Sequence, residues 1–255
     1  MTGALITVSV VSHGHDEDIL RLLADMAAFS GQRIAEVVVT FNMPERTLLD
    51  RVAAHDWPFK VRLVQNPKPL GYGANHNQAF VHCQTPFFCV VNPDIRLARD
   101  PFASLLQALQ ASDAGCAYPW HIAWNAESPV DPARELPTPQ ALLRRYTTSL
   151  QPRYCRPLCW VNGAFLLFKT SAYEQIGGFD AGYFMYCEDV DICLRLQQSG
   201  WRLVGVPEAV VQHRASHASR RNLRHLKWHL QSLKRLWGSD AYAQACQGAR
   251  SSHGA

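Results

Sequence analysis

The chain has 255 residues, of which 47% are hydrophobic and 18% charged, a balance typical of a globular protein with a sizeable core. The N-terminus lacks the basic region and cleavage site of a secretory signal, and no apolar run reaches the roughly 18 to 20 residues of a membrane-spanning helix. We therefore expect one domain, or one domain with a tail, in the cytoplasm. The net charge of +4 is unevenly distributed, since no acidic residue lies between Glu208 and Asp240.

Eight cysteines are spread along the chain, and several lie in apolar segments where a thiol packs as a small hydrophobic group. This distribution indicates free buried thiols in a reducing compartment. Cys155 and Cys159 have a spacing near that of zinc ligands, but no second pair lies close to them in the sequence. A structural zinc site is therefore not expected.

Strands and helices are predicted to alternate through the first part of the chain. Apolar runs rich in β-branched residues indicate strands, and apolar positions three to four residues apart indicate helices. In chain order the strands cover 5–12, 36–41, 60–64 and 87–92, and the helices between them cover 16–29, 44–55 and 75–83. The alternation predicts an α/β fold with a mostly parallel sheet flanked by helices.

The second part of the chain is predicted to be less regular. Prolines recur between residues 118 and 157, which argues against long regular elements and favours a surface region shaped around a ligand. A strand at 160–168, a helix at 190–198 that ends before Gly200, and a short strand at 202–206 are expected to follow.

Asp94 follows the apolar strand at 87–92, and the ligands of open α/β sheets bind at the carboxyl ends of strands. A carboxylate there suits Mg²⁺ or Mn²⁺ bound together with a diphosphate, whereas the Asn-Pro-Asp sequence equally favours a turn that Asp94 caps. The glycine-bearing segment at 66–77 leads into a helix whose first N–H groups could meet an anion. It is not a dinucleotide fingerprint, because His76 takes the place of the third glycine.

Three carboxylates, Glu188, Asp189 and Asp191, fall within four positions after an aromatic segment. Such crowding raises the proton affinity of at least one of them, as a general base requires. Asp191 lies four residues before Arg195, and we assign it mainly to a helical ion pair. Glu188 or Asp189 is then left for chemistry.

Taken in order, these motifs resemble those of the family 2 glycosyltransferases of the GT-A fold, and among them the bacterial rhamnosyltransferase-like members. The resemblance covers nearly the whole chain. It rests on the segments at 8–11, 70–77, 91–94, 177–180 and 188–196, on Gly200-Trp201 and on His213.

The resemblance implies that Asp94 binds Mg²⁺ or Mn²⁺ with the donor diphosphate, and that His213 completes the metal site. It makes Asp189 the base, with Glu188 as the alternative. The implied donor-binding residues are Val11, Ser12, His13, Asn42, Gly71, Tyr72, Asn75, Asn77 and Asn92. Two positions depart from the family pattern. Asn92 replaces the first acid of an Asp-x-Asp motif. The second strand ends in Phe41-Asn42, where many relatives have Asp-Asn or Asp-Asp near the nucleotide base.

The implied activity is transfer of a sugar from a nucleotide diphosphate to an acceptor hydroxyl with inversion, leaning toward L-rhamnose from dTDP-rhamnose. The acceptor would be a saccharide or a polyprenyl-linked molecule in bacterial cell-surface polysaccharide or glycolipid synthesis, and not a nucleic acid. A sugar-phosphate nucleotidyltransferase and a non-catalytic sugar- or nucleotide-binding protein are the alternative interpretations. The absence of a glycine- and basic-rich loop near the N-terminus argues against the nucleotidyltransferase, and a non-catalytic binder leaves the three clustered acids unexplained.

Residues 214–255 are expected to form a tail beyond a GT-A catalytic domain at 1–213. Apolar residues recur there at helical spacing with basic residues between them: Leu223, Leu226, Leu230, Leu233 and Trp237. Such a basic amphipathic helix can lie as a peripheral contact on an anionic membrane at its cytoplasmic face, or it can pack its apolar stripe on the catalytic domain. The sequence leaves both possibilities open.

Overall fold

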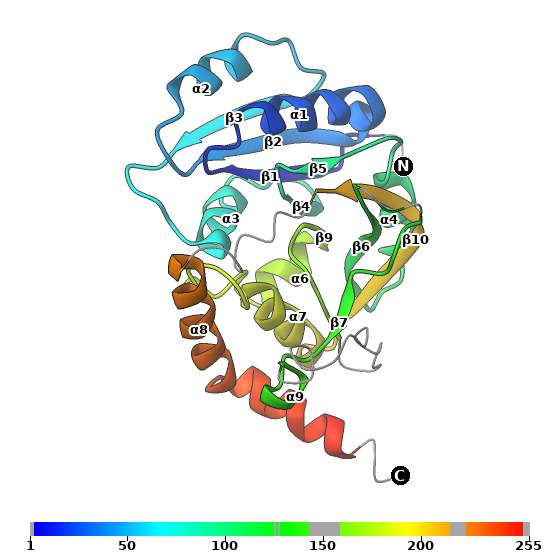
Figure 1. Ribbon diagram of the computed structural model, residues 1–255. Coiled ribbons are helices and arrows are strands. Elements are labelled where there is room, and N and C mark those ends of the chain that lie inside the picture. Colours follow the sequence, from blue (N-terminus) through cyan, green and yellow to red (C-terminus); the bar gives the residue numbers. More distant parts are fainter. Residues whose placement is uncertain (1–2, 125, 127, 143–158, 215–222, 252–255) are drawn as a thin grey trace.

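The computed structural model describes residues 3–124, 126, 128–142, 159–214 and 223–251. Its strands are β1 (Ile6–Ser12), β2 (Ile34–Phe41), β3 (Lys60–Gln65), β4 (Phe87–Val91), β5 (Ile95–Arg96), β6 (Ala114–Ala123), β7 (Ala133–Glu135), β8 (Cys159–Val161), β9 (Phe165–Lys169) and β10 (Arg202–His213). The main sheet has the order β3-β2-β1-β4-β9-β6-β10-β5, and β7 pairs with β8 in a small separate sheet (Figure 1).

The helices cover both faces of the main sheet. They are α1 (Asp16–Ser30), α2 (Arg46–Ala53), α3 (Tyr72–Phe80), α4 (Phe102–Ala108), α6 (Thr170–Gln175), α7 (Glu188–Gln198), α8 (Leu223–Trp237) and α9 (Asp240–Ser251). Buried side chains of α1, α2 and α4 form one core with one face of the sheet, and those of α3, α6 and α7 form a second core with the other face. The predicted α/β layering with a mostly parallel sheet is confirmed.

The direction of the strands brings their polar ends to one edge. β1 pairs in parallel with both β2 and β4, and β6 pairs in parallel with β10. β9 lies antiparallel between β4 and β6, so its first residue, Phe165, meets Val91 at the end of β4, and its later residues meet the start of β6. The segments after β1, β2, β4, β6 and β10 and the segment before β9 therefore share the edge where ligands of α/β sheets bind.

Two strand predictions in the second half need correction. The strand expected at 160–168 is two strands, because the chain turns at Asn162-Gly163-Ala164 and passes from the small sheet into the centre of the large one. The last strand runs on to His213 rather than ending near Val206, and its pairing with β6 shifts register across the segment that holds Pro207. Asn162-Gly163 and Pro207 mark both irregularities in the sequence, but the periodicity of apolar residues alone does not show how the chain continues beyond them.

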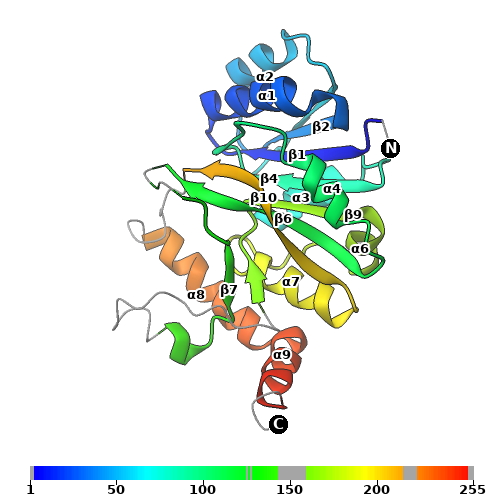
Figure 2. The ribbon, with the colours of Figure 1, turned by 90° about the vertical axis from the view of Figure 1, so that its right-hand side faces the viewer.

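The C-terminal helices pack beside α7 at the end of the molecule remote from α1 and α2 (Figures 1 and 2). A third core joins them to α7 through Val190, Leu194, Leu233, Leu236 and Tyr242. The side-chain amide of Gln198 also donates to the carbonyl of Ala241 at 2.6 Å. Within the described ranges, no helix has the length and apolar character that a membrane crossing demands.

Candidate active site

Asp94 and His213 meet at the edge where the strand ends gather. The short strand β5 begins directly after Asp94 and pairs antiparallel with the end of β10, which sets His213 opposite Ile95. The His213 Nε2 atom lies 3.6 Å from Oδ2 of Asp94, and both side chains are mostly buried. The strand pairing therefore places a carboxylate oxygen and an imidazole nitrogen side by side.

This pair fits a divalent metal only with further ligands. Among the described residues, no three His, Cys, Asp or Glu side chains gather into a ready metal site. An oxygen and an imidazole suit Mg²⁺ or Mn²⁺, and such ions commonly complete their coordination with substrate phosphates and water. The donor set is compatible with an ion that binds together with a diphosphate.

Asn92, at the place of the missing first acid, is engaged with Tyr72. The Tyr72 hydroxyl lies 3.0 Å from Oδ1 of Asn92 and 2.6 Å from the carbonyl oxygen of Gly163. One hydroxyl proton can serve only one acceptor, and the amide oxygen and nitrogen of asparagine have nearly the same shape. An amide turned to present its N–H to Tyr72 satisfies both contacts, which a carboxylate at position 92 could not do.

Asp189 is held beside this group by backbone donors at the start of α7. Its Oδ2 accepts from the N–H of Gly163 at 3.3 Å, and its Oδ1 accepts from the N–H of Val190 at 2.9 Å. Burial raises the pKa of Asp189 to about 6, although these N–H groups and the charge of Arg134 oppose the rise. A carboxylate with such a pKa is ionised at neutral pH and still able to accept a proton.

The other two acids of the cluster have different surroundings. Glu188 is buried, its Oε2 has no hydrogen-bond partner among the described residues, and burial together with Asp189 raises its pKa well above the usual range. Asp191 accepts from Nε of Arg195 at 2.7 Å, which confirms the predicted helical ion pair. Asp189 is the member of this cluster whose side chain is partly exposed.

The turn before α7 is strained. Tyr186 and Cys187 have φ angles of 73° and 65°, in the left-handed region that non-glycine residues rarely adopt. Each such residue costs on the order of 1 to 3 kcal/mol, and the surrounding packing must maintain it. Cys187 then accepts from the N–H of Asp191 at 2.9 Å as the helix begins.

Three asparagines shape the glycine-bearing loop before α3. Asn66 donates through Nδ2 to the side-chain oxygens of both Asn42 and Asn75, at 2.9 and 2.6 Å. Asn42 accepts from the N–H of Leu70, and Asn75 donates to the carbonyl of Gly71. The first N–H of α3, that of Tyr72, donates to the carbonyl of Phe184, so it is not available to an anion.

The end of β1 supplies the residues expected near the nucleotide base. Val11 lies in the sheet, and the buried Ser12 donates to Oε2 of Glu45 at 2.6 Å. His13 is exposed, and the Nδ1 of its ring lies 3.3 Å from the amide nitrogen of Asn42. Partial desolvation of the ring and, to a smaller extent, the nearby His15 lower the pKa of His13.

Two residues of this edge had no signal in the sequence. His121 on β6 stacks edge-on against His213 with ring centroids 5.3 Å apart, and its Nε2 has no partner among the described residues. Burial lowers the pKa of His121 to about 3, so the ring is neutral. The charge of Arg134 on β7 acts on both His121 and Asp189. Arg134 lies in the proline-rich region, where the sequence indicated only an irregular surface.

One expected donor residue lies apart from the rest. The Asn77 side chain accepts from the Tyr173 hydroxyl and the Phe179 N–H, and it donates to the Phe179 carbonyl, so it braces α3 against α6.

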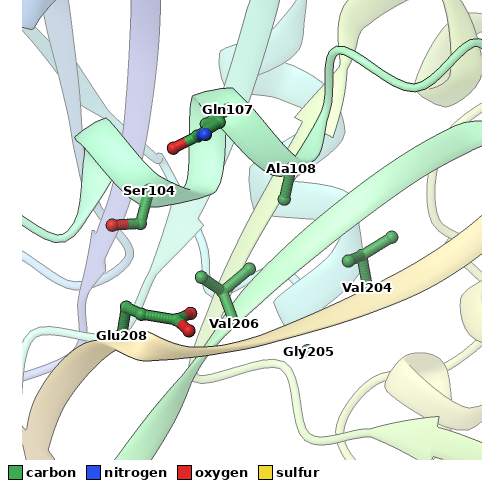
Figure 3. Close-up of a pocket in the computed structure, with 7 residues that line it drawn as sticks. All are labelled: Ser104, Gln107, Ala108, Val204, Gly205, Val206 and Glu208. Carbon is green, nitrogen blue, oxygen red and sulfur yellow. The ribbon is translucent and has the colours of Figure 1, made fainter.

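A hollow of about 390 Å³ lies away from this site, between α4 and β10 (Figure 3). Ser104, Gln107 and Glu208 supply its polar lining, and neither Asp94 nor Asp189 reaches it.

Comparison with known proteins shows that the chain is similar to glycosyltransferases. The family model described as glycosyltransferase like family 2 matches residues 3–228. Rhamnosyltransferase WbbL of Escherichia coli (strain K12) is 27% identical over 248 residues, which cover 91% of this chain and 92% of that protein. N-acetylglucosaminyl-diphospho-decaprenol L-rhamnosyltransferase of Mycobacterium tuberculosis is 29% identical, over 86% of this chain and 78% of that protein.

Solved structures with the same fold are more distant in sequence. The mannosyltransferase PcManGT from Pyrobaculum calidifontis, in complex with GDP-Man and Mn²⁺, has a TM-score of 0.64 at 18% identity. The match covers 98% of this chain and 77% of the mannosyltransferase chain. Residues 1–349 of S. aureus TarS, in complex with UDP-GlcNAc, have a TM-score of 0.66 at 14% identity and cover 94% of this chain and 69% of their own. These likenesses confirm the GT-A fold.

Proposed function

This chain belongs to the glycosyltransferase like family 2, and from that premise we propose that it is an inverting enzyme with Asp189 as its base. A single displacement at the anomeric carbon needs one carboxylate that accepts the proton of the acceptor hydroxyl. The observation that carries the proposal is the state of Asp189: partly exposed, oriented by the N–H groups of Gly163 and Val190, and with a pKa of about 6.

The surroundings of the cluster favour inversion over a covalent route. A retaining mechanism through a glycosyl-enzyme requires a second carboxylate that reaches the anomeric carbon as a nucleophile. Glu188 is buried beneath the site, and Asp191 is held by Arg195. Neither is presented to a substrate as Asp189 is.

Asp94 and His213 are proposed to hold the divalent metal with the donor diphosphate. The ion, when bound, neutralises charge that develops on the departing diphosphate. His121, neutral and packed against His213, keeps the His213 ring in place without adding a competing charge. Arg134, whose charge acts on both His121 and Asp189, is proposed to attract an anionic group between the metal pair and Asp189.

The donor end is proposed to be formed by the residues after β1 and β2. Exposed His13 and the asparagine-braced loop at 66–71 meet there, and the hydrogen bonds of Asn42 fix the loop relative to β1. The names of two relatives, both rhamnosyltransferases, support L-rhamnose as the sugar, and dTDP-rhamnose follows as the donor. Mn²⁺ or Mg²⁺ is supported by a neighbour of the same fold that contains Mn²⁺.

The acceptor is proposed to be a lipid-linked saccharide at the cytoplasmic face of a membrane. One relative is named for a diphospho-decaprenol acceptor, and it matches most of this chain. A catalytic unit at 1–213 with the tail at 214–255 nearest the acceptor is consistent with the positions of α8 and α9 beside α7 (Figure 2).

The test is Asp189→Asn, which retains the shape of the side chain but removes its basicity. We expect binding of the nucleotide sugar, measured calorimetrically with Mn²⁺, to change by less than about threefold, while transfer falls by at least about 10³-fold. Asp113→Asn, at a surface ion pair with Arg202, is the matched control and should retain full activity. Near-normal turnover of the Asp189 variant would remove Asp189 from the mechanism.

A further inference from the structure

Helix α8 presents two different faces, and its inner face holds the loop that leads to the catalytic helix. The Tyr186 hydroxyl lies 2.8 Å from Nδ1 of His225, and the ring of Phe184 packs at a tilt of 40° against Trp228 with centroids 4.8 Å apart. Ser232 donates to the carbonyl of Met185 at 2.8 Å. The inner face is therefore fully used within the protein.

One turn further along α8, Arg235 adds a charged contact to the same loop. Its guanidinium binds both carboxylate oxygens of Asp180 at 2.7 to 3.0 Å and lies over the ring of Tyr183. Leu233 and Leu236 are buried beside it in the core shared with α7 and α9. These contacts fix the rotation of α8 about its own axis.

The outer face of α8 carries an apolar stripe that the described residues leave largely exposed, although the Trp237 indole N–H donates to the carbonyl of Pro137 at 2.9 Å. Leu223 is 86% exposed, Leu230 59%, Leu226 45% and Trp237 38%. At 100° per residue these four positions fall within about 60° of the helix circumference, so they form one continuous stripe. Isolated exposed leucines are ordinary, but an aligned row on one helix marks an interaction surface.

Positive charge borders this stripe. Lys227 and Lys234 lie on one flank and Arg224 lies beyond them, all exposed, and the helix has no acidic residue. The absence of acids extends in the sequence from Glu208 to Asp240. An apolar stripe with a cationic border is complementary to a surface that offers acyl chains beneath anionic headgroups.

We propose that the outer face of α8, defined by Leu223, Leu226, Leu230 and Trp237 with Lys227 and Lys234, binds the surface of an anionic phospholipid bilayer. The helix is about 22 Å long, shorter than the roughly 30 Å hydrocarbon core, so it lies in the plane of the interface. Because the inner face holds the loop before α7, docking sets the catalytic cluster at a fixed height above the lipid. Binding of α8 to a bilayer would bring the enzyme to the lipid-linked acceptor. Only this link to the acceptor rests on the proposed function.

The experiment is co-sedimentation of the full chain with vesicles. We expect wild type to pellet with vesicles of phosphatidylcholine plus phosphatidylglycerol at low salt, and far less with phosphatidylcholine alone. The triple variant Leu223→Gln, Leu226→Gln, Leu230→Gln keeps helix propensity and should weaken partitioning by at least about tenfold. Lys227→Glu with Lys234→Glu should weaken it by about tenfold or more.

Matched controls change equally exposed residues on other parts of the surface. Val81→Gln alters an apolar side chain that is 79% exposed at the end of α3, and Arg99→Glu reverses an exposed charge between β5 and α4. Both should partition as wild type does. Thermal melting followed by circular dichroism should place every variant within a few degrees of wild type, which separates lost docking from lost folding.

Absence of wild-type binding to the anionic vesicles at low salt, or equal binding by the triple variant, would overturn the proposal. A concentration-dependent dimer that the triple variant loses would instead make a second copy of the chain the occupant of the stripe. Transfer to a soluble acceptor, measured on the same proteins, should be unchanged by the outer-face variants. A chain that binds vesicles but transfers no sugar would refute the proposed function and leave this surface intact.

Discussion

The Tyr72 hydroxyl lies 2.6 Å from the carbonyl oxygen of Gly163, and the N–H of the same glycine donates to Asp189. Tyr72 therefore fixes the peptide segment that orients the proposed base, and we expect its hydroxyl to act by positioning that segment. The 3.0 Å contact with Asn92 extends this brace to the strand end before Asp94. A change at Tyr72 should act on catalysis without acting on donor affinity.

We expect Tyr72→Phe to lower kcat by about tenfold and leave the KM for the donor within about twofold. The lost hydroxyl frees the Gly163 peptide to move and leaves buried partners unsatisfied, at a cost of about 1 to 3 kcal/mol in the free energy of unfolding. Tyr173→Phe is the matched control, because its hydroxyl donates to Asn77 at 2.7 Å away from the cluster. It should lose similar stability and keep its kcat; an equal fall in both variants would leave Tyr72 without a positioning role.

The raised pKa of Asp189 predicts how activity depends on pH. The base must be ionised to accept a proton, so kcat should fall as the pH drops through about 6. A profile that is flat between about pH 5 and 8 would mean that another group is the base.

The same pKa predicts a cost in stability. The native state keeps the Asp189 proton up to about pH 6, whereas the unfolded chain releases it near 3.8. The free energy of unfolding is therefore highest, as far as Asp189 is concerned, at low pH, and it falls as the pH rises between these two values. Asp189→Asn removes the buried charge and should raise the free energy of unfolding at pH 8 by about 1 to 3 kcal/mol relative to wild type. Urea titrations at about pH 4 and pH 8 measure this, and a variant that gains nothing at pH 8 contradicts it.

The 3.6 Å approach of His213 to Asp94 predicts that the two residues act on one metal. We expect His213→Ala to raise the Mn²⁺ concentration needed for half-maximal activity by about 10- to 100-fold, and Asp94→Asn to do so at least as strongly. His55→Ala, at an exposed ring that stacks on Trp57, is the control. Unchanged Mn²⁺ titration curves in both site variants would separate this pair from the metal.

Gly71 allows the loop before α3 to touch the loop before α7. A Cβ atom at Gly71 would lie 2.6 Å from the carbonyl oxygen of Tyr183 and 2.8 Å from Cα of Phe184, both backbone atoms that cannot rotate away. Gly71→Ala should therefore lower the unfolding free energy by about 1 to 3 kcal/mol and raise the donor KM. Gly3→Ala meets nothing within 4 Å and should have no effect in the same urea titrations and kinetic assays.

The sequence predicted the first half of the fold well because its strands and helices have distinct periodicities and are separated by clear turns. Asp94 and Asp189 belong to short motifs, whereas His213 was expected at the site only from the family resemblance. Strand pairing alone shows that Asp94 and His213 lie side by side. Arg134 escaped notice because it lies on a three-residue strand in a proline-rich region, and its approach to Asp189 depends on pairing with β8. Contacts of that kind have no local signature.

The strand expected at 160–168 failed for a related reason. Val161 and Ala164 are apolar and buried, but Asn162-Gly163 interrupts the run with a dipeptide typical of turns. That turn supplies both the N–H for Asp189 and the carbonyl for Tyr72, so the site depends on an irregular segment that the strand prediction passed over. The boundary between 1–213 and 214–255 stays a prediction.

The left-handed turn at Tyr186 and Cys187 determines at which residue α7 begins, and so the direction in which each of its side chains points. Each residue of an α-helix rotates the next side chain by about 100°, so a start displaced by one residue would carry Asp189 away from Gly163 and bring Glu188 or Val190 into its place. Two successive positive φ angles, at Tyr186 and Cys187, set the backbone conformation from which α7 begins at Glu188. The turn therefore places Asp189, rather than Glu188 or Val190, beside the N–H of Gly163.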